Sequence, residues 1–306
     1  MGGGHAHGHA PTATGRHRRR LLAVLLLTLL VAGVQVVGGL LSGSLALLAD
    51  AGHMLTDATG VGIALVAATL ASRPATDART FGLQRAEILA ALANGLLLLA
   101  LGVWVVVEAV RRWSDPPDVA TGLMLAVALG GAAANLVGLL LLHRGREESL
   151  NVRGAYLEVL ADLLGSIAVI VAAVVIMMTG WTRADVVASA VIGAVVVPRA
   201  ALLLRDVVDV LLEATPRGLD LQQVRDHIGG VRGVLEVHDL HAWTITSGAP
   251  ALSAHVVVDA DCLAEDRTGE VLDRLTACLT EHFAVEHCTF QLEPVGHREH
   301  EAAQHA

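Results

Sequence analysis

Six apolar segments, each long enough to cross a lipid bilayer, constrain the fold of this chain more than any other feature. Each holds about 20 or more residues, the length that a helix rising ~1.5 Å per residue needs to cross a hydrocarbon core of ~30 Å. The first segment lacks a small-residue cleavage site and leads directly into the second, so we expect a membrane span there and not a cleaved signal peptide. The expected spans are residues 21–41, 44–71, 86–110, 119–142, 154–179 and 182–204.

The arginines predict how these spans are oriented, because the chain contains no lysine. Arginines gather before the first span, between the second and third, and between the fourth and fifth, whereas the other side carries only Arg111, Arg112 and Arg183. The positive-inside rule then places both termini in the cytoplasm, as an even number of spans requires. The lysine-free, Ala/Arg/Val-rich composition is typical of a GC-rich bacterial genome, so we expect a multi-pass protein of the plasma (inner) membrane.

The character of the chain changes after Arg205. Residues 206–295 contain 16 acidic and 5 basic residues, a formal charge of −11 that argues against nucleic acid as a partner and favours divalent cations. Shorter patterns predict an α-β-β-α-β order, typical of a small α+β ferredoxin-like domain. The expected elements are helices near Leu219–Ile228 and Arg267–Phe283 and strands at Val234–Ile245, Ala251–Asp259 and His287–Leu292.

The predicted fold is therefore an all-α six-helix transmembrane domain at residues 21–205, followed by a small α+β ferredoxin-like cytoplasmic domain at residues 206–295. Histidine-containing tails at residues 1–20 and 296–306 flank the two domains. Their histidines could chelate metal loosely, or the tails could be dispensable. The tail histidines are His5, His7, His9, His297, His300 and His305.

Two motifs inside the apolar segments point to the function: His53-x-x-x-Asp57 in the second span and Glu158-x-x-x-Asp162 in the fifth. A charged side chain at the centre of a membrane helix costs roughly 2.5–3.5 kcal/mol, so these carboxylates need a partner. Spacing of i, i+4 places both members of each motif on one helix face. A shared divalent cation would satisfy all four side chains at once.

The predicted topology makes the two spans antiparallel, which should bring His53 near Asp162 and Asp57 near Glu158. One imidazole with three carboxylates is a workable ligand set for zinc, and the absence of sulfur argues against copper(I). The alternative is that these side chains form interhelical hydrogen bonds or a proton path. Asp50 lies on the same helix face and could line the outer mouth or serve helix packing.

Four segments around these residues are distinctive: SLALLADAGHMLTD at 44–57, RAEILAALANG at 85–95, HDLHAW at 238–243 and LSAHVVV at 252–258. They resemble the cation diffusion facilitator family, in particular its bacterial zinc, cadmium and cobalt exporters. The resemblance covers roughly residues 20–295, and it implies six transmembrane helices, a ferredoxin-like domain, a homodimer and metal export in exchange for protons. Glu158 departs from it, since related proteins usually carry histidine at that position.

The ligand chemistry predicts proton-coupled efflux of a divalent cation by alternating access, most simply of Zn²⁺. Zinc binds neutral imidazole and ionised carboxylates, so metal binding releases protons and protonation expels the metal. The carboxylate of Glu158 hardens the site, which leaves Mn²⁺, Fe²⁺, Co²⁺ and Cd²⁺ as alternatives. A membrane metal sensor is a further alternative. We expect no enzyme activity and no cofactor beyond the metal, because H-E-x-x-H, G-x-S-x-G and P-loop motifs are absent from the sequence.

A second group of possible ligands lies in the cytoplasmic domain: His238, His241, His255 and Glu293. By the resemblance, metal held there would draw two acidic protomers together, although isolated strand histidines are also common structural residues. The three cysteines contain no C-x-x-C pair, so we interpret them as small hydrophobes or surface thiols, with Cys288 as a possible ligand beside His287. The expected partners are divalent metal ions, protons, membrane lipid and a second copy of the chain.

Overall fold

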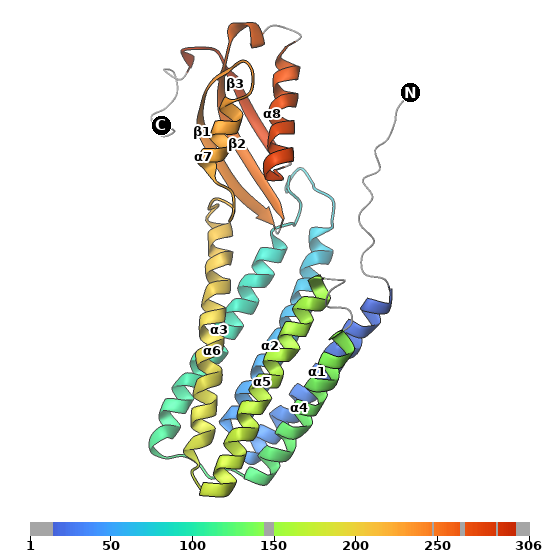
Figure 1. Ribbon diagram of the computed structural model, residues 1–306, viewed down its shortest axis with the longest axis vertical. Helices are drawn as coiled ribbons and strands as arrows, with labels where there is room; N and C mark the ends of the chain where they lie inside the picture. The colour runs from blue at the N-terminus through green and yellow to red at the C-terminus, as the bar shows by residue number, and fades with distance from the viewer. Residues whose placement is uncertain (1–14, 144–149, 247, 264–266, 286, 298–306) are drawn as a thin grey trace. The chain divides into compact units, whose positions relative to one another are not determined.

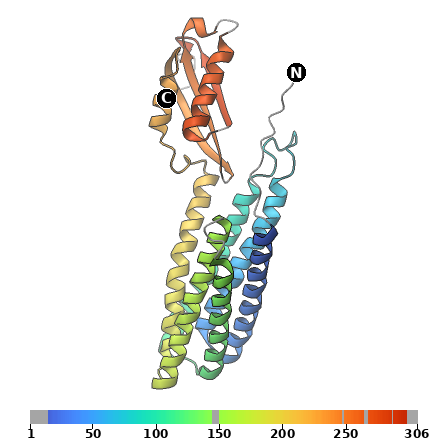
Figure 2. The same cartoon turned by 45° about the vertical axis from the view of Figure 1, so that its right-hand side comes forward.

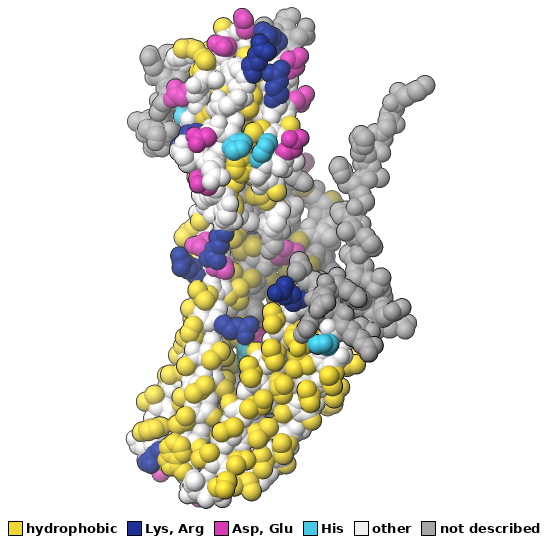
Figure 3. Space-filling model, in the orientation of Figure 1, with side chains coloured by type: hydrophobic (Ala, Val, Ile, Leu, Met, Phe, Trp, Pro, Cys, Tyr) yellow, Lys and Arg dark blue, Asp and Glu magenta, His cyan; other side chains and the backbone are white. Residues whose placement is uncertain are grey.

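The computed structural model describes residues 15–143, 150–246, 248–263, 267–285 and 287–297 (Figures 1 and 2). Among the described residues, six helices are long and apolar enough to cross a membrane, which confirms the predicted number of spans. Hydrophobic side chains cover the helical part in the space-filling view, whereas charged side chains gather on the α+β part (Figure 3). The six helices are α1 (Gly15–Ser42), α2 (Leu45–Ala71), α3 (Ala86–Ser114), α4 (Thr121–His143), α5 (Leu150–Thr179) and α6 (Arg183–Leu211).

Two of these helices extend further than hydropathy predicts. The apolar pattern ends at residues 110 and 204, but α3 continues to Ser114 and α6 to Leu211. The charged residues that follow these two positions lower the hydropathy, but they do not interrupt the hydrogen bonds of the helix. In α3 the extra turn is favourable because Arg112 lies at the negative end of the helix and donates to Glu108 at 2.9 Å.

The chain divides into two compact units, which we describe separately. The first contains residues up to Ile63 and Ala93–Leu202, and therefore most of all six helices. Its largest buried cluster is rich in alanine, which lets helices approach closely where lipid provides no hydrophobic driving force. The fully or nearly fully buried members include Ala46, Leu47, Met124, Ala128, Val169, Ala172 and Ala173.

A carboxylate from α6 holds the beginning of α2. Asp185 is buried, and it accepts hydrogen bonds from the Ser44 hydroxyl at 2.6 Å, the Leu45 N–H at 2.8 Å and the Ala46 N–H at 3.3 Å. The first N–H groups of a helix have no partner within it, and the positive end of the helix dipole favours an anion. This contact fixes the start of the helix that carries the His53 motif.

The second unit contains residues 64–92 and the chain after Leu202. Its α+β part has the predicted α-β-β-α-β order, with a short 3-10 helix η1 (Ala260–Leu263) after the second strand. The sheet order is β1-β2-β3, with β1 antiparallel to β2 and β2 parallel to β3, so α8 forms the crossover between the two parallel strands. The elements are α7 (Leu221–Gly229), β1 (Val234–Thr246), β2 (Ala249–Val258), α8 (Thr268–Phe283) and β3 (His287–Glu293).

Both helices of this part pack on one core. Val224 and Ile228 of α7 and Leu275 and Leu279 of α8 have no exposed surface, and they join the inward residues of the sheet in a single cluster. Asp220 caps α7 by accepting from the N–H of Gln222 at 2.8 Å. The fold class predicted from the sequence is thus confirmed for this domain.

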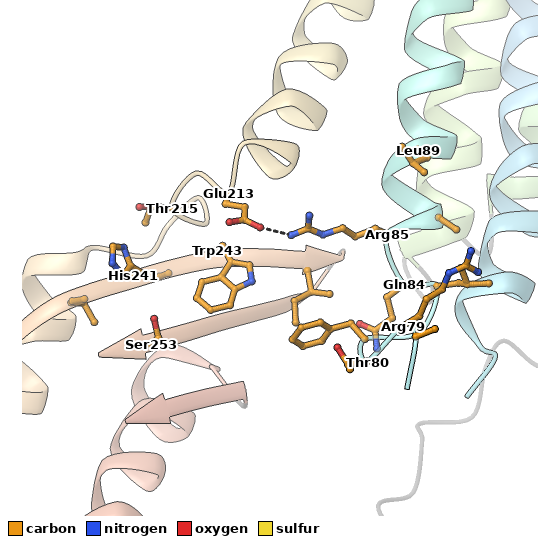
Figure 4. A pocket seen from close by; sticks show the side chains of 18 of the residues that line it. Arg79, Thr80, Gln84, Arg85, Leu89, Glu213, Thr215, His241, Trp243 and Ser253 are labelled. Atoms are coloured by element: carbon orange, nitrogen blue, oxygen red, sulfur yellow. Dashed lines mark hydrogen bonds and ion pairs between the residues drawn. The ribbon is translucent and has the colours of Figure 1, made fainter. Parts of the chain in front are cut away.

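The segment before α3 also packs within the second unit (Figure 4). Arg85 donates to Glu213 at 2.8 Å, and the Thr246 hydroxyl donates to Glu87 at 2.9 Å. A cavity of about 930 Å³ lies among these residues, with Trp243 and His241 on its wall. The end of α6 is thereby tied to the beginning of α3.

Candidate metal centre

Three of the four predicted intramembrane ligands converge in the first unit. His53, Asp57 and Asp162 each offer one ligand-type atom within 4.8 Å of those of the other two. The helical spacing in α2 brings His53 Nε2 to 3.4 Å from Asp57 Oδ2, and α5 contributes Asp162 from the opposite side. The three side chains are buried or half-buried, so the cluster forms a compact polar site between two apolar helices.

Glu158 lies one turn before Asp162 on α5 and is exposed. It falls outside the group of three, although it interacts electrostatically with Asp57. The i, i+4 spacing places Glu158 on the same face of α5 as Asp162, one turn closer to the beginning of the helix. Glu158 as a direct ligand therefore stays a prediction.

Two atoms of the cluster have unused hydrogen-bonding capacity. Asp162 Oδ1 and His53 Nδ1 are buried and have no hydrogen-bond partner among the described residues. Leaving a buried polar atom unpaired costs about 1–3 kcal/mol, which a bound cation or a proton would offset. A cationic partner thus fits the donor set of one imidazole nitrogen and several carboxylate oxygens.

Asp50 does not line an open mouth. It is 2% exposed, and its Oδ2 atom accepts hydrogen bonds from Gln35 Nε2 of α1 at 2.8 Å and from Ser166 Oγ of α5 at 3.1 Å. Gln35 and Ser166 have no exposed surface at all. The packing alternative is therefore correct, because this network ties α1, α2 and α5 together one turn from His53.

One further charged residue belongs to the site and was missed in the sequence. Arg199 on α6 interacts electrostatically with His53, Asp57, Glu158 and Asp162. Its positive charge offsets part of the negative charge that the carboxylates place in the membrane. The sequence feature that could have indicated Arg199 is that it is a single arginine inside the sixth apolar span, next to Pro198.

The cytoplasmic domain contains a second cluster, formed by His238, His255 and Glu293. His238 and His255 are register partners on β1 and β2, with ring centroids 5.3 Å apart. Glu293 at the end of β3 is 1% exposed, with one carboxylate oxygen 2.8 Å from His255 Nδ1 and the other 3.4 Å from His238 Nε2. The parallel β2–β3 pairing is what brings the glutamate to the two histidines.

A register shift in β1 separates His241 from this cluster. Asp239 has a φ of +46°, and the shift lies between His238 and His241. His241 is more than half exposed and pairs with Asp239 at 2.7 Å, while the second oxygen of Asp239 lies 3.5 Å from His255 Nε2. Asp239 is thus a neighbour of the cluster that the sequence reasoning did not single out.

The three thiols are half-buried, which agrees with the small-hydrophobe alternative and not with surface thiols. Burial raises the pKa of Cys288 to about 11, and its thiol donates to the carbonyl of Val285 at 3.4 Å. Burial, and secondarily the charge of Glu281, raises the pKa of Cys278. Metal ligation requires thiolate, so this environment disfavours Cys288 as a ligand. Of the tail histidines only His297 is described; the others lie outside the described residues.

Known proteins resemble this chain over its whole length. A family model described as the cation efflux transmembrane domain matches residues 21–212, and one described as the cation efflux protein, cytoplasmic domain, matches residues 216–295. The metal cation efflux system protein CzcD of Cupriavidus metallidurans is 43% identical over 305 residues, covering 100% of this chain and 94% of that protein.

Two other relatives carry more specific names. The cadmium, cobalt and zinc/H(+)-K(+) antiporter of Bacillus subtilis is 41% identical, over 86% of this chain and 85% of that protein. The zinc transporter ZitB of Escherichia coli is 41% identical, over 94% and 92%. A solved structure described as the metal-bound C-terminal domain of the CzcD transporter is 40% identical over 24% of this chain and 99% of that chain, with a TM-score of 0.22.

Proposed function

This chain belongs to the cation diffusion facilitator family of metal-cation efflux transporters, and on that premise we propose that it exports Zn²⁺ from the cytoplasm in exchange for protons. The convergence of His53, Asp57 and Asp162 inside the membrane-spanning bundle carries the proposal. Such a group is costly in hydrocarbon unless a cation or protons occupy it. Reversible occupancy by one or the other is what an exchanger requires.

Zinc is favoured by the mixed ligand set. Imidazole nitrogen together with carboxylate oxygen suits a tetrahedral zinc site, and zinc is named for two of the relatives. Cadmium and cobalt are named with zinc for one of them, and the oxygen-rich cluster also suits Mn²⁺ and Fe²⁺. These ions are the alternatives to be compared directly. A sensor is not favoured, because the relatives are transporters.

The same atoms support the proposed proton coupling. Zinc and protons compete for His53, Asp57 and Asp162, so metal release on the proton-rich side would load the site with protons. Arg199 would lower the electrostatic cost of the ionised, metal-free site between these two states. The proton gradient across a bacterial inner membrane then drives export, provided that both termini face the cytoplasm, as the arginine distribution predicts.

The cytoplasmic domain has a separate role in this proposal. We assign metal binding to His238, His255 and Glu293, with Asp239 beside them, and homodimer formation to the domain as a whole. The formal charge of −11 would make two such domains repel each other until cations bind. Metal bound there would regulate the pairing of the two domains and would not be the ion that is transported.

Transport in sealed vesicles tests the proposal. Inverted membrane vesicles containing the full chain should take up zinc when an inward-acidic gradient is imposed, and zinc addition should release protons from the lumen. Asp162→Asn should abolish both signals, whereas Asp115→Asn, in the exposed α3–α4 connection, should preserve them. Zinc uptake that does not respond to collapse of the proton gradient would overturn proton coupling, and absence of any metal uptake would overturn zinc export.

A further inference from the structure

A pair of histidines lies on the outside of the cytoplasmic domain, apart from the two clusters described above. His227 is in the last turn of α7 and His282 in the last turn of α8. Both side chains are exposed, and their ring centroids are 5.1 Å apart with an interplanar angle of 52°. Residues 55 positions apart in the sequence are brought together because both helices pack on the same core.

The hydrogen bonds of these rings fix their tautomer. His227 Nδ1 lies 2.8 Å from the carbonyl oxygen of Gln223, and His282 Nδ1 lies 3.0 Å from that of Cys278. A carbonyl oxygen only accepts, so each Nδ1 must carry the proton and donate it. In the neutral ring the lone pair then resides on Nε2, which in both residues has no hydrogen-bond partner among the described residues.

This arrangement matches the requirements of a metal-binding imidazole. A histidine ligand almost always donates its other N–H to a backbone carbonyl, a carboxylate or water, which orients the ring and raises its basicity. Two imidazoles on one tetrahedral ion, with Zn–N bonds of about 2.0–2.1 Å, have their ring centroids roughly 5 Å apart. The ring centroids of His227 and His282, 5.1 Å apart, match that spacing. The ring of Phe283 packs edge-to-face against the His227 ring, with the two centroids 4.9 Å apart, and so restricts rotation of the His227 ring.

The electrostatic surroundings also favour a cation. Both histidines lie at helix C-termini, where the dipole is negative, and each directly follows an acidic residue in the sequence, Asp226 or Glu281. From these observations we propose that His227 and His282 form a surface-accessible binding site for a divalent transition-metal ion. Two protein ligands leave the remaining positions to water, so the ion exchanges readily. Imidazole ligands select zinc, copper(II), nickel and cobalt over magnesium and calcium.

Equilibrium dialysis of the full-length protein in detergent with radioactive zinc tests this site. His227→Gln and His282→Gln should each weaken the binding of one zinc ion tenfold or more. The double variant should lose no more than either single variant, because both side chains hold the same ion. His143→Gln, an exposed histidine at the end of α4, serves as the control and should bind zinc like the parent.

A ligand-replacing variant separates coordination from folding. His227→Cys keeps a zinc ligand at the position and should retain more zinc binding than His227→Gln, with unchanged helix content and elution volume for both. Unchanged zinc binding in both single glutamine variants would overturn the site, as would independent, additive losses. The rings would then only satisfy carbonyl groups at the two helix ends. Neither result depends on whether the protein transports zinc.

Discussion

Asp185 and Ser44 are 141 positions apart in the sequence, yet the carboxylate accepts the hydroxyl hydrogen bond at 2.6 Å and caps the start of α2. Asp185→Ala should therefore destabilise the helical bundle, because the N–H groups of Leu45 and Ala46 lose their acceptor. A lost N-cap typically costs about 0.5–2 kcal/mol. The expected result is a lower melting temperature in detergent by differential scanning fluorimetry, with a smaller decrease for Ser44→Ala. The exposed variant Asp118→Ala should melt like the parent.

Two adjacent glycines of α4 provide a matched test of the network around Asp50. A Cβ atom at Gly131 would lie 2.7 Å from Gln35 Nε2, the atom that donates to Asp50, whereas nothing lies within 4 Å of one at Gly130. Gly131→Ala should lower both stability and zinc transport. Gly130→Ala should be neutral or stabilising by up to about 1 kcal/mol, since alanine favours helix over glycine. Equal behaviour of the two variants would show that the network tolerates displacement of Gln35.

Replacing Glu158 with histidine should change ion selectivity. Glu158→His exchanges a hard carboxylate oxygen for imidazole, so zinc and cadmium should gain relative to Mn²⁺ and Fe²⁺. Competition between ions over a pH range, in vesicles with matched protein amounts, measures the change. Identical ion rankings and identical pH profiles for parent and variant would place Glu158 outside the coordination sphere.

The effect of replacing Arg199 should depend on the negative charge of Glu158. Arg199→Gln alone leaves the negative charges of Asp57, Asp162 and Glu158 without their nearby cation, and transport should fall by roughly tenfold or more, equivalent to about 1.4 kcal/mol. Adding Glu158→Gln removes one of those charges and should restore part of the rate. A double variant that is no better than Arg199→Gln would contradict the charge-balance interpretation.

The reactivity of Cys288 should report its raised pKa. With a pKa of about 11, the thiol stays mostly protonated at neutral pH, and its alkylation rate should rise about tenfold per pH unit up to pH 10. An unperturbed thiol, with a pKa of about 8.5, would level off in the same range. Iodoacetamide labelling of a Cys262→Ser/Cys278→Ser variant, followed by mass spectrometry, measures the profile with glutathione as the reference.

The sequence predicts the architecture well because each element has a strong periodic signal. Long apolar runs identify all six membrane helices, and alternation identifies the strands that carry His238 and His255. The helices α3 and α6 extend beyond their apolar runs, since hydropathy measures lipid preference and not helical hydrogen bonding. The i, i+4 rule with an antiparallel arrangement brings His53, Asp57 and Asp162 together, as the structure does.

Other parts of the site could not be predicted from paired motifs. Arg199 is a lone charge, so no spacing rule connects it with residues on α2 and α5. The role of Asp50 depends on the rotation of α1, which decides whether Gln35 reaches it. The separation of His241 from His255 depends on a positive φ at Asp239 that regular alternation does not reveal. Metal ligation by the four intramembrane residues stays a prediction until an ion is bound.

Pro198 lies inside α6 and has no N–H, so the carbonyl of Ala194 one turn earlier lacks its helical hydrogen bond. The hydrogen bonding of α6 is therefore weakened immediately before Arg199. At the beginning of the same helix, Asp185 holds α6 against α2. A bend at Pro198 would change the distance between Arg199 and the carboxylates, while the turn that carries Asp185 would stay attached to α2. The same helix thus combines an end that is fixed to α2 with a point of weakened helical hydrogen bonding next to Arg199, the positive charge that faces the carboxylates.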